Sequence, residues 1–273
     1  MSAHQVVPRR ARGGNLFSRS EARCRRSAGT RRLARYRVVL STGLLPVDRL
    51  TEGIDVAGRI VHLVRHGEVE NPDGVLYGRM PGFHLSDRGR KMAILAAEEL
   101  AARDQDSGVQ RISRVVCSPL ERAVESAEPI ARLLGLEIET DARIIEAESY
   151  LEGGQFEMSL SILAKPAAWR FLVNPLRPSW GEPFAEVSDR VDSLLREVSV
   201  GDGGATVLVS HQLPIWIAHR RAVGHRLAHD PRKRRCALSS ITTLEPTSRG
   251  FSEIGYREPA RSLLGGAVDV GAV

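Results

Sequence analysis

Three short apolar stretches of the sequence each end in charged or imidazole side chains that could do chemistry together. The stretches and the groups that follow them are residues 60–64 with Arg65 and His66, residues 115–117 with Ser118 and Arg122, and residues 205–209 with His211. A short apolar run of this kind is typical of a strand buried in a parallel sheet. Because ligands bind beyond the carboxyl ends of such strands, we expect these side chains to gather at one edge of the sheet.

Two arginines and two histidines at one sheet edge would form a compact, positively charged pocket. A guanidinium group presents paired N–H donors that match a phosphoryl group, and a helix that starts at Pro119 would add its dipole. A single exposed arginine or histidine is usually only solvated, and the tripeptide Arg65-His66-Gly67 alone carries little weight. The coincidence of three such clusters favours a phosphate-binding pocket.

The elements that position these groups alternate between strands and helices. A capping box at residues 118–121, with proline at the first helical position, predicts a helix that runs to Leu134 and is kinked by Pro129. The sequence also predicts a helix after an N-cap at Ser86, helices at residues 187–195 and 215–223, and strands at residues 237–244 and 251–256. This alternation predicts an α/β fold, a three-layer sandwich with a mostly parallel central sheet.

The order and spacing of the three clusters resemble those of the histidine phosphatase superfamily, the phosphoglycerate mutase-like proteins. The resemblance covers roughly residues 59–256 and rests on three motifs: VHLVRHGE at residues 61–68, CSPLERAVESA at residues 117–127 and VLVSHQLPI at residues 207–215. It implies a phosphoglycerate mutase-like fold in which His66 is the nucleophile that accepts the phosphoryl group. It also implies that Arg65, Arg122 and His211 complete the phosphate pocket.

The resemblance further implies a carboxylic acid, between the second and third motifs, that protonates the leaving group. Glu146, in the stretch Arg143-Ile144-Ile145-Glu146, matches that position best. The family often follows this acid with glycine and then an aromatic-Glu-Gly step, whereas this chain has ESYLEG at residues 148–153. Glu148 and Glu152 therefore remain alternatives for the acid.

The implied reaction is metal-independent hydrolysis of a phosphomonoester through a phosphohistidine, with no cofactor and with a small phosphorylated metabolite as substrate. Near neutral pH an imidazole can be unprotonated and can act as a nucleophile without a metal. A phosphoglycerate mutase is the runner-up, but only 65 positions separate Glu146 from His211, fewer than the mutases' long substrate-capping insertion needs. A non-catalytic phosphate-binding relative is third, because such a protein has no need of a nucleophile at His66.

Other groups that could carry chemistry have simpler interpretations. His225 and His229, with Asp230 alongside, have a spacing that could bind a metal on a helix. A solvated helix end is favoured, because no further ligand has a recognisable spacing. The basic run at residues 232–235 is interpreted as a surface turn. Arg79, in the loop after the first strand, could contact the non-reacting part of a substrate.

Composition narrows the remaining possibilities for the 273 residues. Three widely spaced cysteines exclude a disulfide scaffold and a cysteine-rich zinc module. Residues 1–58 hold twelve arginines, no lysine and four acids, a net charge of +8, whereas the remaining residues carry −2. Codon bias in a GC-rich genome explains this asymmetry better than a nucleic-acid partner does. No apolar run approaches the roughly 18 residues that a transmembrane helix needs, so we expect a cytoplasmic protein without membrane contact.

These patterns divide the sequence into three segments. Residues 1–57 are expected to be a basic, disordered extension, because they have no helical or strand period. A targeting peptide and a segment absent from the native product are the alternatives for this extension. Residues 58–257 are expected to form the catalytic domain, and residues 258–273, rich in glycine and alanine, a disordered tail. A homodimer is left open.

Overall fold

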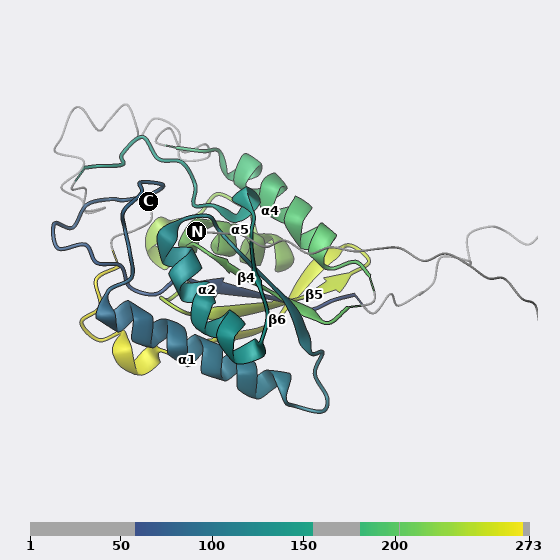
Figure 1. Ribbon diagram of the computed structural model, residues 1–273. Helices are drawn as coiled ribbons and strands as arrows, with labels where there is room; N and C mark the ends of the chain where they lie inside the picture. The colour runs from purple at the N-terminus through teal and green to yellow at the C-terminus, as the bar shows by residue number, and fades with distance from the viewer. Residues whose placement is uncertain (1–57, 155–180, 202, 270–273) are drawn as a thin grey trace, which may run out of the picture. The chain divides into compact units, whose positions relative to one another are not determined.

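The structure is a computed structural model that describes residues 58–154, 181–201 and 203–269. The predicted extension at residues 1–57 and the last four residues of the predicted tail lie outside the described residues. Within the described residues, a six-stranded sheet is covered by helices on both faces (Figure 1). The predicted three-layer α/β fold is confirmed.

The central sheet has the strand order β3-β2-β4-β1-β5-β6. The strands are β1 (Val61–Arg65), β2 (Ile112–Cys117), β3 (Ile138–Thr140), β4 (Ala205–Ser210), β5 (Ile241–Thr247) and β6 (Gly250–Arg257). Neighbours among the first four strands of this order pair in parallel, whereas β5 and β6 pair antiparallel. The sheet is mostly parallel, as predicted. The sequence analysis missed β3, because its three residues are largely exposed and form no apolar run.

Among the described residues, two helices cover each face of the sheet. Helices α1 (Asp87–Asp104) and α2 (Glu121–Leu134) lie on one face, and α4 (Phe184–Val198) and α5 (Gln212–Ala222) lie on the other (Figure 1). Along β1, Leu63 packs in the core beneath α4 and α5, whereas Val64 packs beneath α1 and α2. Both faces of the strand are therefore buried, which explains its nearly continuous apolar run. None of the described helices is long and apolar enough to span a membrane.

The two predicted N-caps have different outcomes. The hydroxyl of Ser86 accepts a hydrogen bond from the Gly89 amide at the start of α1, so this N-cap is confirmed. The predicted capping box at residues 118–121 is wrong, because α2 begins at Glu121 after an N-cap, Leu120, without a side-chain hydrogen bond. The hydroxyl of Ser118 is instead within hydrogen-bond distance of His211. Ser118 therefore contacts a residue that is distant in sequence instead of capping the helix that follows it.

The predicted strand at residues 237–244 begins only at Ile241. The residues before it form a turn in which Ser239 has a φ of 54°, a left-handed conformation that no strand residue adopts. The amide of Ser239 donates to the carbonyl oxygen of His66 at 3.2 Å, and the amide of Arg65 donates to that of Ser240 at 3.1 Å. These two hydrogen bonds connect the turn to the backbone at the end of β1.

The tail differs from the sequence-based expectation over residues 258–269. This segment contains a short 3-10 turn (Arg261–Leu263), and Leu263, Leu264 and Ala267 pack against the cluster of Met92, Leu238 and Ala260. The expectation of disorder was wrong here, because the few apolar side chains of the segment fall on one side and find a hydrophobic partner. The carbonyl of Gly266 also accepts a hydrogen bond from Arg88.

Candidate active site

The register of the parallel strands brings three sequence-distant turns together. Arg65, the last residue of β1, is paired with Ser210 of β4, and Val209 of β4 is paired with Cys117 of β2. The residues that follow these strands, including His66 and His211, therefore meet at one edge of the sheet. This is the gathering that the sequence predicts.

The imidazole of His66 is buried and has a defined tautomer. Its Nδ1 lies 2.7 Å from the carbonyl oxygen of Gly67. A carbonyl oxygen only accepts, so Nδ1 carries the proton and donates it. The lone pair of the neutral ring is therefore on Nε2. This is the protonation pattern that a nucleophilic imidazole needs.

The backbone around His66 is held tightly. Its amide donates to the carbonyl of Ser210 at 3.0 Å, and its own carbonyl accepts from Ser239 at 3.2 Å. Gly67 follows where the chain passes very close to α1, and a Cβ atom there would lie 2.4 Å from the carbonyl oxygen of Gly89. Only glycine fits this approach. The position of the imidazole is therefore set by the hydrogen bonds of its backbone and by the close contact of the turn after β1 with α1.

The two arginines of the site are buried and only partly paired. Nη1 of Arg65 donates to the carbonyl of Cys236 at 2.6 Å, and Nη2 of Arg122 donates to that of Gly78 at 2.6 Å. Among the described residues, Nε of Arg65 and both Nε and Nη1 of Arg122 are buried without a hydrogen-bond partner. Buried N–H groups are rarely left unpaired in proteins. These donors are suited to an anion.

His211 lies beside His66, with the two ring centroids 5.2 Å apart. Its Nε2 is 2.7 Å from the hydroxyl oxygen of Ser118, and its buried Nδ1 has no partner among the described residues. The hydroxyl of Ser118 orients the ring from the end of β2. The sequence analysis missed this role, because it assigned the serine to a helix cap.

Burial controls the protonation of both histidines. Burial, followed by the charges of Arg122 and Arg65, lowers the pKa of His66 well below its ordinary value of 6.5. Burial, followed by Arg122 and His66, lowers the pKa of His211 in the same way. The positive charge of the cluster therefore comes from its arginines, and a bound anion would raise the pKa of both rings.

Glu146 is the buried member of the three candidate acids. Burial raises the pKa of its carboxyl group, against the opposing effects of the Ala147 amide at 2.9 Å and of Arg122. Glu148 is exposed. Glu152 is committed to the backbone, because its Oε1 accepts from the amides of Arg79 at 2.9 Å and Ser149 at 3.3 Å. Burial therefore favours a protonated carboxyl group at Glu146, close to the charge of Arg122.

The tail places a carboxylate on Arg65. Both oxygens of Asp269 accept hydrogen bonds from the two terminal nitrogens of this guanidinium group. Arg65 and Asp269 thus form an ion pair. The amide of the preceding Val268 donates to the carboxylate of Glu68 at 2.9 Å. No sequence pattern indicates this contact, because a single aspartate among glycines and alanines has no periodicity. Arg65 thus binds an anion supplied by the chain itself.

Comparison with known proteins decides the family. The family model described as the histidine phosphatase superfamily, branch 1, matches residues 61–258. The chain belongs to this superfamily. The match covers all three strand-end clusters, so the three motifs are those of a histidine phosphatase.

Relatives of this superfamily member include proteins with and without an assigned activity. The uncharacterized protein Rv0525 of Mycobacterium tuberculosis is 44% identical over 201 residues, which cover 73% of this chain and 96% of that protein. Phosphoserine phosphatase 1 of Hydrogenobacter thermophilus is 33% identical over 157 residues, which cover 56% of this chain and 71% of that protein. The solved structure of a phosphoserine phosphatase from Entamoeba histolytica, in complex with 3-phosphoglyceric acid, has a TM-score of 0.59. It is 20% identical, covers 73% of this chain and 96% of that one, and shows the shared fold alone.

Two basic residues that the sequence singled out have partners within the chain. The guanidinium group of Arg79 donates to the carbonyl of Glu146 at 2.7 Å and to the carboxylate of Glu182 at 2.8 Å. Its contact with a substrate stays a prediction. Arg234 is not part of an exposed turn, because it is half-buried and donates to His229 at 2.9 Å and Gln212 at 3.2 Å.

The histidine pair considered for a metal is separated in the structure. His225 is exposed, whereas the ring of His229 lies 5.0 Å from that of Phe184 and accepts from Arg234. In the part of the chain that the structure describes, no three His, Cys, Asp or Glu side chains are grouped to hold a metal ion.

Proposed function

We propose that this histidine phosphatase hydrolyses a small phosphomonoester without a metal, through a phosphohistidine on His66. The observation that carries the proposal is the set of unpaired, buried N–H donors around a histidine whose Nε2 lone pair is free. The phosphoserine phosphatase among the relatives supports hydrolysis as the outcome. Phosphoglycerate mutase-type transfer is the alternative.

The proposed reaction has two steps, and Glu146 acts as an acid in the first and as a base in the second. Nε2 of His66 attacks phosphorus in line, the ester P–O bond breaks, and Glu146 gives its proton to the departing alkoxide. Water then attacks the phosphohistidine and gives a proton to Glu146, the P–N bond breaks, and inorganic phosphate leaves. Arg65 and Arg122 neutralise the charge on the equatorial oxygens, which is the main demand of phosphoryl transfer.

A screen of the purified protein against a panel of phosphomonoesters, with phosphoglycerate interconversion included, tests this function. We expect release of inorganic phosphate, and we expect the activity to survive EDTA because every proposed role belongs to a side chain. Activity that is lost on chelation and restored by one specific cation would contradict the metal-independent mechanism. Interconversion without net phosphate release would favour the mutase.

A pH profile tests the protonation states that the mechanism needs. The reaction requires neutral His66 and protonated Glu146, and their ordinary pKa values of 6.5 and 4.5 leave no pH at which both forms dominate. Burial lowers the first pKa and raises the second, so both shifts favour the pair of protonation states that the reaction needs. We expect kcat/KM for an alkyl phosphate to fall below the lowered pKa of His66 and above the raised pKa of Glu146. A rate that climbs steadily with pH through the neutral range would contradict this assignment.

A further inference from the structure

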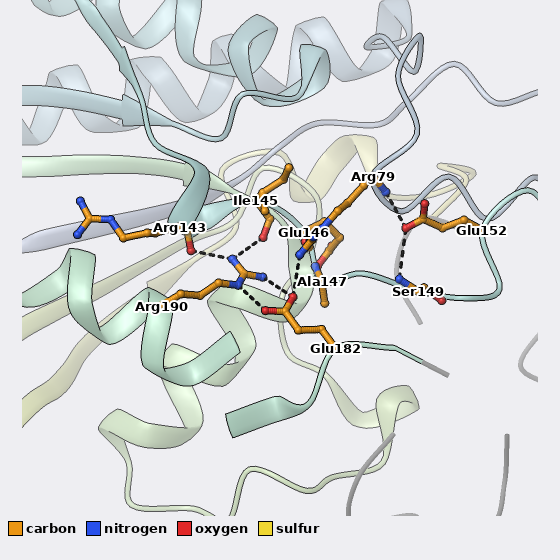
Figure 2. A network of polar contacts seen from close by, with 9 residues as sticks. All are labelled: Arg79, Arg143, Ile145, Glu146, Ala147, Ser149, Glu152, Glu182 and Arg190. Atoms are coloured by element: carbon orange, nitrogen blue, oxygen red, sulfur yellow. Dashed lines mark hydrogen bonds and ion pairs between the residues drawn. The ribbon is translucent and has the colours of Figure 1, made fainter. Parts of the chain in front are cut away.

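The backbone that carries Glu146 is held by side chains along its whole approach to the site (Figure 2). Arg190 donates through Nη1 to the carbonyls of Arg143 and Ile145, at 2.7 and 2.8 Å. The hydroxyl of Ser210 donates to the carbonyl of Ile144 at 2.6 Å. With Arg79 on the carbonyl of Glu146 at 2.7 Å, four successive carbonyl groups each have a side-chain donor.

Glu182 joins the two arginines of this arrangement (Figure 2). Its Oε1 accepts from Nε of Arg190 at 2.8 Å, and its Oε2 accepts from Nη2 of Arg190 at 3.1 Å and from Nη2 of Arg79 at 2.8 Å. The Glu182 side chain is only 12% exposed. One carboxylate thus fixes two guanidinium groups that come from different parts of the chain, the loop after β1 and helix α4.

The backbone next to Glu182 adds a second attachment to the same segment. Its amide donates to the carbonyl of Glu148 at 2.9 Å, and the preceding Gly181 forms a bridge with Ser149. A Cβ atom on Gly181 would lie 2.2 Å from the carbonyl oxygen of Glu148, so only glycine permits this contact. Glu182 is therefore held against the segment that it braces.

These contacts hold the chain segment that carries the candidate acid Glu146. Residues 145–149 lie between a short 3-10 turn (Ala142–Ile144) and an irregular loop, so regular secondary structure does not set their conformation. A general acid has to stay within hydrogen-bond reach of the leaving oxygen. We infer that Glu182, Arg79 and Arg190 are positioning residues that hold the carboxyl group of Glu146 at the leaving group. The inference rests on the proposed function.

Glu182→Ala tests the inference with two substrates. An alkyl phosphate needs a proton on its leaving oxygen, whereas p-nitrophenolate leaves readily without one. We expect kcat/KM for the alkyl ester to fall on the order of 10²-fold, the cost of a misplaced catalytic group, while p-nitrophenyl phosphate is nearly unaffected. The basic limb of the alkyl-ester pH profile should move as well. A purely structural role would slow both esters alike.

A double-mutant cycle shows whether Glu182 acts through Glu146. If Glu182 acts only by positioning Glu146, its loss has no effect once the acid is absent. Glu182→Ala should therefore cause no further fall in kcat/KM for the alkyl ester when Glu146→Gln is already present. Additive losses would overturn the inference. Arg190→Lys is the second variant if Glu182→Ala does not fold, since lysine keeps the charge but cannot serve Glu182 and both backbone carbonyls. The same selectivity is expected for it.

Glu253→Ala is the matched control for Glu182→Ala. Glu253, on β6, is 10% exposed and also joins two basic side chains, His219 of α5 and Arg235 of the segment before β5. We expect it to leave the ratio of the two ester rates unchanged, even if the melting temperature falls. If Glu182→Ala slows both esters equally, the inference is wrong while the proposed function stands. If the native protein hydrolyses neither ester, the proposed function is wrong and the inference falls with it.

Discussion

We expect the His66→Ala protein to lose turnover of every phosphomonoester while it keeps its fold. The proposed covalent step uses one atom, Nε2, and no neighbouring group can replace it in line with phosphorus. Removing a nucleophile or its direct partner from a hydrolase costs on the order of 10⁴- to 10⁶-fold in kcat. The side chain makes one local hydrogen bond, to Gly67, so circular dichroism and the melting curve should stay close to native.

The matched control for this experiment is His62→Ala. His62 lies four positions earlier in the chain, is equally buried, and is bonded to the hydroxyl of Thr243 at 3.0 Å. Its loss should lower stability without abolishing turnover. A short exposure to a ³²P-labelled substrate should label the native and His62→Ala proteins but not His66→Ala. Turnover or labelling that survives in a folded His66→Ala protein would refute the phosphohistidine mechanism.

Glu146→Gln should separate substrates by their leaving groups. Glutamine keeps the size and polarity of the side chain but has no proton to give. General acid catalysis is typically worth about 10²- to 10⁴-fold, so alkyl monoesters should slow by that factor and p-nitrophenyl phosphate far less. The quantity to compare is kcat/KM, because it reports the steps up to the phosphoenzyme and excludes its later hydrolysis.

Two neighbouring substitutions act as controls for Glu146→Gln. Glu148→Gln changes an exposed side chain and should leave both substrates unaffected. Glu152→Gln keeps an oxygen that can accept from the amides of Arg79 and Ser149 but removes the negative charge, so it should act on stability more than on the leaving group. Equal losses on both esters in Glu146→Gln would point to a binding role. A selective loss in one of the controls, with Glu146→Gln near normal, would move the acid to that residue.

The strand-end cluster could be predicted from sequence because one geometric rule governs it. Parallel strands bring their carboxyl ends to the same edge, so Arg65, His66, Arg122 and His211 could be placed together without any long-range contact being known. Short apolar runs buried on both faces made the strands visible. The motifs then named the family.

The acid and its supports could not be placed in this way. Glu146 lies in an irregular segment whose conformation depends on Arg79, 67 positions away, and on Arg190, which reaches the Ile145 carbonyl across 45 positions. Local sequence patterns carry no information about such pairs. The same limit explains why Ser118 was assigned to a helix cap, where a local partner was available.

The carboxylate of Asp269 is a ligand of Arg65 that belongs to the same chain. Because it is tethered, it would compete with a phosphate ligand for Arg65 at an effective concentration that dilution does not lower. A phosphomonoester and inorganic phosphate would both have to displace it from the same two nitrogens. Each would then bind with its intrinsic dissociation constant divided by the fraction of molecules whose Arg65 is free. The KM of the substrate and the inhibition constant of the product would therefore contain one common factor, and removing the carboxylate would lower both in the same proportion.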